Sequence, residues 1–120
     1  MVVLMRVFKI GLLVGAVVVA QQPEERKPVR KISIVAERFT FNPSRITVKQ
    51  GELVEFVLQS DDTDHGFKIS LAGIDVAIPP IGKGEARVRF IATEKGTFPF
   101  ECSRACGAGH DLMRGGIVVR

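Results

Sequence analysis

The run Leu53-Val-Glu-Phe-Val-Leu58 follows the turn residues Gln50-Gly51 and is rich in residues that favour β-strands. On both sides of it, apolar residues alternate with polar ones, as in strands that bury one face. Turn residues separate these runs at nearly regular intervals, and no helical apolar period is present. The sequence therefore predicts an all-β fold, an antiparallel sandwich or barrel, rather than an α/β or helical fold. The alternating positions are Ile32 and Ile34, Phe39 and Phe41, Ile46 and Val48, Phe67 and Ile69, Val88 and Phe90, Phe98 and Phe100, and Ile117 and Val119.

The first twenty residues differ in composition from the rest of the chain. Arg6 and Lys9 lie in a stretch without acidic residues, and residues 10–20 are an uninterrupted run of apolar residues and glycine. A positive start and a short apolar stretch that ends in small residues are typical of a secretory signal. The run is shorter than the ~20 residues that span a bilayer. We predict a cleaved signal peptide over residues 1–20, with an uncleaved membrane anchor as the alternative. Both predict export to the periplasm or the outer face of the plasma membrane.

The remaining chain divides into a linker and one domain. Residues 21–31 are polar, carry charges of both signs and contain two prolines, which is typical of a linker. Residues 32–120 are the length of one small domain. The formal net charge is +4, and two of these charges belong to Arg6 and Lys9. Because the domain is only weakly basic and has no aromatic residues within a basic patch, we predict no nucleic-acid partner. Residues 70–80 could hold a short helix, but Gly73 and Pro79-Pro80 argue against it.

Two thiols, an imidazole and a thioether lie within twelve residues, Cys102-Ser-Arg-Ala-Cys106-Gly-Ala-Gly-His110-Asp-Leu-Met113. After residue 20 the chain has only two cysteines, two histidines and one methionine. Four of these five residues lie in this segment, and the remaining one is His65, further upstream. Soft sulfur ligands with imidazole select copper, and a weak methionine ligand is typical of copper electron-transfer sites. The cysteine spacing is too long for a redox Cys-x-x-Cys pair but suits two thiolates that bridge two metal ions. We therefore predict a site for two copper ions, each bound by both sulfurs and one imidazole.

The same residues match the pattern of a known family. An upstream histidine followed by Cys-x3-Cys-x3-His-x2-Met resembles the dinuclear copper (CuA) domain of cytochrome c oxidase subunit II, and more distantly the matching domain of nitrous oxide reductase. The resemblance covers residues 32–120. The residues that carry it are His65, Cys102, Cys106, His110 and Met113, with the framework segments Phe39-x-Phe41-x-Pro43, Ile46-x-Val48-x-x-Gly51, His65-Gly-Phe67, Gly96-Thr-Phe98 and Gly109-His-Asp-Leu-Met-Arg-Gly115.

The resemblance implies a Greek-key cupredoxin sandwich that passes single electrons from a donor such as a cytochrome to an acceptor. It implies that His65 and His110 each bind one copper and that Met113 binds weakly. It also implies a main-chain carbonyl ligand from Arg104. The expected partners are redox proteins, either a cytochrome or an oxidase subunit. We expect no catalysis by the isolated chain, because no open coordination position or acid–base pair is evident.

The chain departs from the family in three respects. Arg104 stands where oxidase subunits usually carry glutamate, whose side chain serves a second cation site. The chain has no Trp and no Tyr, so the aromatic residue that oxidase subunits use for electron entry has no counterpart by type. The N-terminus offers at most one membrane anchor, where subunit II normally has one or two membrane helices. These differences favour a free-standing or weakly anchored carrier over a subunit held inside an oxidase.

Three other functions fit parts of the pattern. A mononuclear blue-copper carrier would use His65, Cys106, His110 and Met113. A copper-delivery or storage protein would hold Cu(I) with the same ligands and transfer it without redox cycling. A binding module without metal would be closed by a disulfide between Cys102 and Cys106. Such a short loop gains little from cross-linking, because disulfide stabilisation grows with loop length, so the copper hypotheses are favoured.

Overall fold

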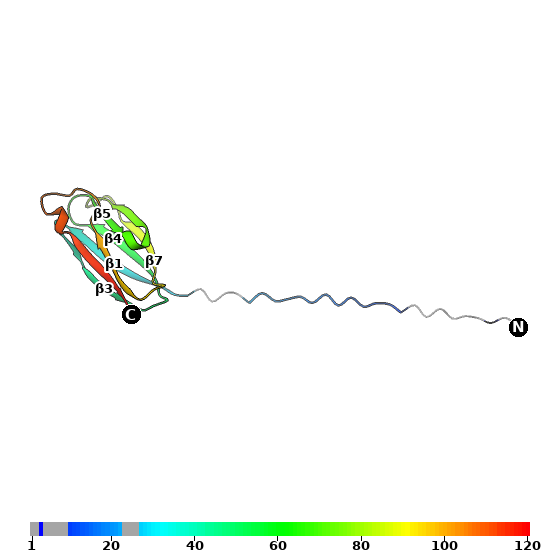
Figure 1. The fold of residues 1–120 in the computed structure, drawn as a ribbon. Helices are drawn as coiled ribbons and strands as arrows, with labels where there is room; N and C mark the ends of the chain where they lie inside the picture. Colours follow the sequence, from blue (N-terminus) through cyan, green and yellow to red (C-terminus); the bar gives the residue numbers. More distant parts are fainter. Residues whose placement is uncertain (1–2, 4–9, 23–26) are drawn as a thin grey trace.

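The computed structural model describes residue 3, residues 10–22 and residues 27–120. The charged start of the predicted leader, with Arg6 and Lys9, lies outside the described residues. Residues 10–22 are exposed and have no regular secondary structure (Figure 1). No helix in the described ranges has the length and apolar character needed to cross a membrane.

The folded region is a sandwich of two β-sheets, which confirms the all-β prediction. One sheet has four strands in the order β2-β1-β4-β7, and the other has five in the order β3-β9-β8-β5-β6. Regular secondary structure within the described residues otherwise consists of two single-turn 3-10 helices. The elements are β1 (Val29–Glu37), β2 (Thr40–Asn42), β3 (Arg45–Val48), β4 (Leu53–Ser60), β5 (His65–Ile69), η1 (Ser70–Ala72), β6 (Ile74–Ile78), β7 (Ala86–Ile91), β8 (Gly96–Glu101), η2 (His110–Leu112) and β9 (Arg114–Val119).

The sheets are mixed, so the expectation of a wholly antiparallel sandwich was wrong. β1 pairs with β4 in parallel, and β3 pairs with β9 in parallel; the other pairs are antiparallel. The parallel pairs arise because the chain crosses to the opposite sheet between β2 and β3 and again between β3 and β4. Alternation of apolar residues reports which face of a strand is buried, but it carries no information about the direction of the neighbouring strand.

Between residues 70 and 80 the sequence argued against a short helix, and no strand was predicted there. The segment contains a 3-10 turn and then β6, which pairs with β5. Gly73 has a φ of 65° and ends the turn in the left-handed conformation that glycine adopts without strain. The glycine and the prolines after Ile78 therefore bound a strand instead of replacing it.

The core contains the inward-facing residues of both sheets, and its centre is aromatic. Phe67 is completely buried. Its ring centroid lies 4.9 Å from that of Phe100, 5.8 Å from that of Phe56 and 5.9 Å from that of Phe41. Rings at these separations add pairwise attraction to the burial of apolar area. The core thus forms a rigid support directly beneath His65, two residues earlier on β5.

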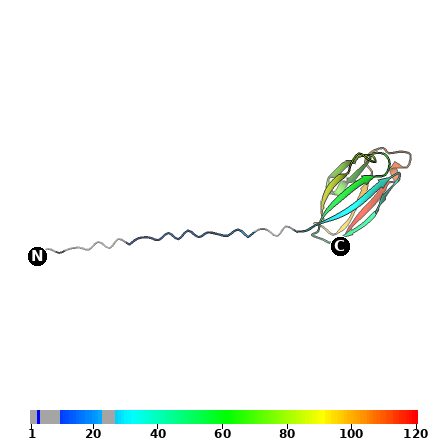
Figure 2. The same cartoon turned by 180° about the vertical axis from the view of Figure 1, so that it is seen from behind.

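Loops that are distant in sequence meet at one end of the sandwich. The pairing of His65 with Ile78 and of Glu101 with Arg114 places the start of β5 and the end of β8 at this end. The chain enters β1 at the other end, close to the C-terminus (Figure 2). The N-terminal segment therefore leaves the domain far from these loops.

Candidate metal centre

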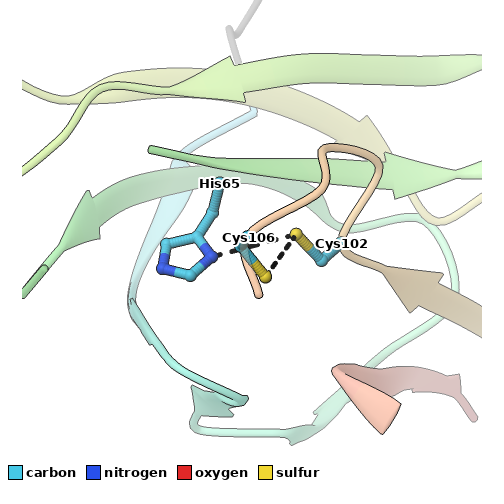
Figure 3. Close-up of side chains that lie close together, drawn as sticks. All are labelled: His65, Cys102 and Cys106. Carbon is cyan, nitrogen blue, oxygen red and sulfur yellow. Dashed lines mark hydrogen bonds between the residues drawn. The ribbon is translucent and has the colours of Figure 1, made fainter. Parts of the chain in front are cut away.

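Three of the predicted ligands are fixed by the five-stranded sheet. His65 is the first residue of β5, Cys102 directly follows β8, and Met113 directly precedes β9. The loop between β8 and β9 also carries Cys106 and His110. Figure 3 shows one ring nitrogen of His65 facing Cys102, which in turn faces Cys106. One sheet and the loop that joins two of its strands therefore supply every side chain of the predicted ligand set.

The sulfur of Cys102 is surrounded by donor atoms. Its Sγ lies 3.8 Å from Nδ1 of His65, 3.8 Å from Sγ of Cys106 and 3.2 Å from the carbonyl oxygen of Arg104. The amide of Gly66 donates a hydrogen bond of 3.4 Å to the same sulfur. His65 is fully buried and Cys102 is 5% exposed, so these groups meet away from bulk water.

The sulfur of Cys106 has a similar set of neighbours. Its Sγ lies 3.6 Å from Nδ1 of His110 and 3.9 Å from Sδ of Met113. Met113 is fully buried, whereas His110 is half-buried. The sulfurs thus form a pair with one imidazole on each side, the thioether beside Cys106 and the Arg104 carbonyl beside Cys102.

The spacing of these atoms fits shared metal ligands. Two ligands on one tetrahedral ion, at bond lengths of ~2.0 Å for nitrogen and ~2.3 Å for sulfur, lie roughly 3.3 to 3.8 Å apart. Neighbouring donors here are 3.2 to 3.9 Å apart. Sulfur with imidazole is also the donor chemistry that copper favours. Both cysteines are free thiols, so the structure gives no support to the disulfide alternative.

The environment of Cys106 keeps its thiol protonated at neutral pH. Burial, the hydrogen bond with Cys102 and the charge of the Cys102 thiolate together raise the pKa of Cys106 to about 11. Metals bind cysteine as the thiolate, so metal binding at this site must displace a proton. The affinity for metal should therefore rise with pH.

His65 is held by a carboxylate that the sequence did not identify as part of the site. Its Nε2 lies 2.6 Å from Oδ1 of Asp62, which also accepts a hydrogen bond of 2.8 Å from the amide of Thr63. Burial alone would raise the pKa of Asp62, but hydrogen bonds from the Arg38 amide and from His65 outweigh it and lower the pKa. A carboxylate on the far nitrogen of a ligating histidine fixes the tautomer and the ring orientation. The spacing Asp-x-x-His was the available signal, but acidic residues beside a histidine are equally typical of an ordinary surface loop.

Close backbone contacts hold the ligand loop against the domain. A Cβ atom at Gly66 would overlap Oγ of Ser103 and lie 2.8 Å from the Ser103 amide nitrogen. Ser103 is in turn anchored by a hydrogen bond of 2.6 Å from its hydroxyl to Asp75. The His65-Gly-Phe67 segment therefore needs glycine at its centre, because β5 and the ligand loop touch there. Asp75, for which the sequence suggested no role, helps to fix the loop.

Replacing Gly109 by alanine should loosen the ligand loop. A Cβ atom there would overlap the ring of Phe39, which packs against this part of the loop. We expect a loss of roughly 1 to 3 kcal/mol in the free energy of unfolding, measured by urea denaturation, because overpacking forces neighbours to shift. Gly116→Ala is the matched control, since its Cβ would come no closer than 3.8 Å to another residue. Equal stability of the two variants would contradict this packing.

The chain resembles known proteins in both sequence and fold. It is 34% identical over 90 residues to cytochrome c oxidase subunit 2 of Thermus thermophilus, covering 74% of this chain and 64% of the relative. A second Thermus thermophilus sequence is covered over 52% of its length. The chain thus spans between about half and two thirds of the curated relatives that it matches.

Two solved structures share both the fold and about a quarter of the aligned residues with this chain. A chain of a heme-copper terminal oxidase dimer superposes with a TM-score of 0.63 and 26% identity, covering 76% of this chain and 65% of that chain. The metal-binding domain of a Cu(I)-exporting P-type ATPase from Streptococcus pneumoniae D39, with Cu(I), superposes with a TM-score of 0.57 and 26% identity, covering 77% and 86%. The family model of the cupredoxin-like domain matches residues 9–119. The chain therefore belongs to the cupredoxin-like domain family.

Proposed function

We propose that the protein is a one-electron carrier with a dinuclear copper centre of the CuA type. The observation that carries this proposal is the pair of buried sulfurs, 3.8 Å apart, with one imidazole nitrogen beside each. The similarity to subunit 2 of cytochrome c oxidase supports the same function. Cys102 and Cys106 would bridge two coppers, with His65 and His110 as the nitrogen ligands. Met113 and the carbonyl of Arg104 would be the weaker ligands.

Copper, when bound, supplies the one-electron redox chemistry, and the chain supplies position and environment. Backbone hydrogen bonds fix the ligand loop: the Cys102 amide donates to the Met113 carbonyl at 3.1 Å, and the Met113 amide donates to the His110 carbonyl at 3.1 Å. Asp62 orients His65. Burial of both sulfurs keeps water away from them. Donor atoms held in this way would move little when the charge of the site changes.

The arrangement along the chain and the location are also proposals. We assign residues 1–20 to an export signal or membrane anchor, residues 21–31 to a linker and residues 32–120 to a Greek-key cupredoxin domain. The last three residues of this linker already belong to β1, which begins at Val29. The charged start and apolar run of the first segment support export. The expected location is the periplasm or the outer face of the plasma membrane. The expected partners are a cytochrome donor and an acceptor such as an oxidase subunit, and Arg104 favours a carrier outside a permanent oxidase complex.

Copper reconstitution tests the proposed function. Residues 21–120, which include every strand that the structure describes, should bind about two copper ions per chain. The EPR spectrum should show hyperfine splitting from one electron shared by both nuclei. One copper with splitting from a single nucleus would replace the proposal by the mononuclear blue-copper carrier. Failure to bind copper would exclude both.

A copper-delivery function is the second candidate. The similarity to the metal-binding domain of a Cu(I)-exporting ATPase is the observation that favours it. Delivery requires that the metal leave readily, whereas an electron carrier must keep it through repeated oxidation and reduction. Cycling at a constant potential without loss of copper to a chelator would support the carrier. Release of copper at each reduction would support delivery.

A further inference from the structure

We propose that Arg38 is a positioning residue that joins the two halves of the candidate metal centre. Arg38 lies in the turn between β1 and β2 of the four-stranded sheet, whereas the predicted side-chain ligands all come from the other sheet and its loop. It contacts both halves, one through its backbone and the other through its side chain. The redox part of this inference rests on the proposed function; the structural part does not.

The first contact is with the His65 half. The amide of Arg38 donates a hydrogen bond of 2.8 Å to Oδ2 of Asp62. The other carboxylate oxygen of Asp62 lies 2.6 Å from Nε2 of His65. The carboxylate is therefore held from two sides. A shift of the β1–β2 turn would move the Asp62 side chain and, with it, the imidazole of His65.

The second contact is with the Cys106 half. Nε of Arg38 donates a hydrogen bond of 2.8 Å to the carbonyl oxygen of Cys106. The adjoining residue Phe39 packs its ring against Gly107 and Gly109 in the same loop. These contacts hold the loop that carries Cys106 and His110 against the opposite sheet. A continuous path of hydrogen bonds runs from His65 through Asp62 and Arg38 to Cys106.

The guanidinium also places a permanent positive charge beside the loop, because arginine stays protonated at any ordinary pH. Reduction lowers the positive charge of a metal centre, so a nearby positive charge favours the reduced form. Removal of the charge should therefore favour the oxidised form and lower the midpoint potential. Arg38 is exposed, so this effect should weaken in high salt.

Thiol alkylation of the protein prepared without metal tests the positioning role. Arg38→Met removes the donor and the charge, Arg38→Lys keeps the charge without the Nε geometry, and Arg120→Met is the control at the far end. We expect Arg38→Lys, which keeps the charge, to raise the alkylation rate of Cys106 about three- to tenfold, because the hydrogen bond from Nε to the loop is lost. Trypsin cleaves after Arg104, so Cys102 and Cys106 fall in separate peptides and can be counted independently. An unchanged Cys106 rate in Arg38→Lys overturns the positioning role.

The midpoint potential of the copper-loaded protein tests the charge. Arg38→Met should shift the equilibrium towards the oxidised form about three- to tenfold, up to ~59 mV for a one-electron couple. Arg38→Lys and Arg120→Met should keep the wild-type potential, and the shift should shrink at ~1 M salt. An unchanged potential in Arg38→Met overturns the charge effect. If the wild-type protein lacks the two-copper spectrum, the proposed function fails, and the alkylation rates still decide the positioning role.

Discussion

Cys102→Ser should lower the copper content from about two ions per chain to one or none and abolish the spectrum of a shared electron. The Cys102 sulfur lies between His65 and Cys106 and beside the Arg104 carbonyl. A serine hydroxyl cannot replace a thiolate that bridges two soft metal ions. Metal analysis and EPR on the same reconstituted sample provide the measurement.

Cys106→Ser is the matched comparison, because the dinuclear and the mononuclear proposals give the two cysteines different roles. In a dinuclear centre both sulfurs bridge, so either substitution removes the two-copper spectrum. In a mononuclear blue-copper site Cys106 is the thiolate ligand and Cys102 is spare, so Cys102→Ser would leave metal content and colour unchanged. Retention of the wild-type spectrum in Cys102→Ser, with its loss in Cys106→Ser, would contradict the dinuclear proposal.

Phe67→Ala should cost roughly 3 to 5 kcal/mol in the free energy of unfolding. The residue is fully buried and its ring contacts three other aromatic rings. The substitution removes this contact area and leaves a cavity that rigid neighbours can only partly fill. Domains of this kind are stable by about 5 to 15 kcal/mol, so a large share of the total would be lost. Urea denaturation followed by circular dichroism measures the change.

Phe98→Ala is the control for this effect. Phe98 is half-buried and its ring packs against Phe90 at 5.4 Å, at the margin of the core. The same change of side chain should therefore cost clearly less than at Phe67. Equal losses at the two positions would show that the aromatic cluster is not the centre of the core.

Local patterns predicted the strands but not their directions. Residues such as Ile34, Phe41 and Ile117 are buried as their alternation indicated. The parallel pairing of β1 with β4 depends on how the chain crosses between sheets, which no local pattern records. β6 was not predicted even though Ile74, Val76 and Ile78 alternate, because glycine and proline near so short a run also indicate a loop.

In the candidate site, too, some residues could be predicted from local sequence and others could not. Cys102, Cys106, His110 and Met113 could be predicted together because their spacing is short. The contribution of Arg38 could not be predicted, because the residue is 68 positions from Cys106 in sequence and the turn that carries it belongs to the opposite sheet. Contacts of this kind depend on how the two sheets pack, and they leave no signature in composition or periodicity.

The position of His65 on a separate strand has a consequence for folding. Cys102, Cys106, His110 and Met113 are close in sequence, so an unfolded chain can already present them to a metal, whereas His65 reaches them only when β5 has joined the sheet. A ligand that binds both native and denatured chains stabilises the fold only through the ratio of its two affinities. Copper should therefore raise the melting temperature less than its affinity for the native protein suggests, and most of the gain should depend on His65.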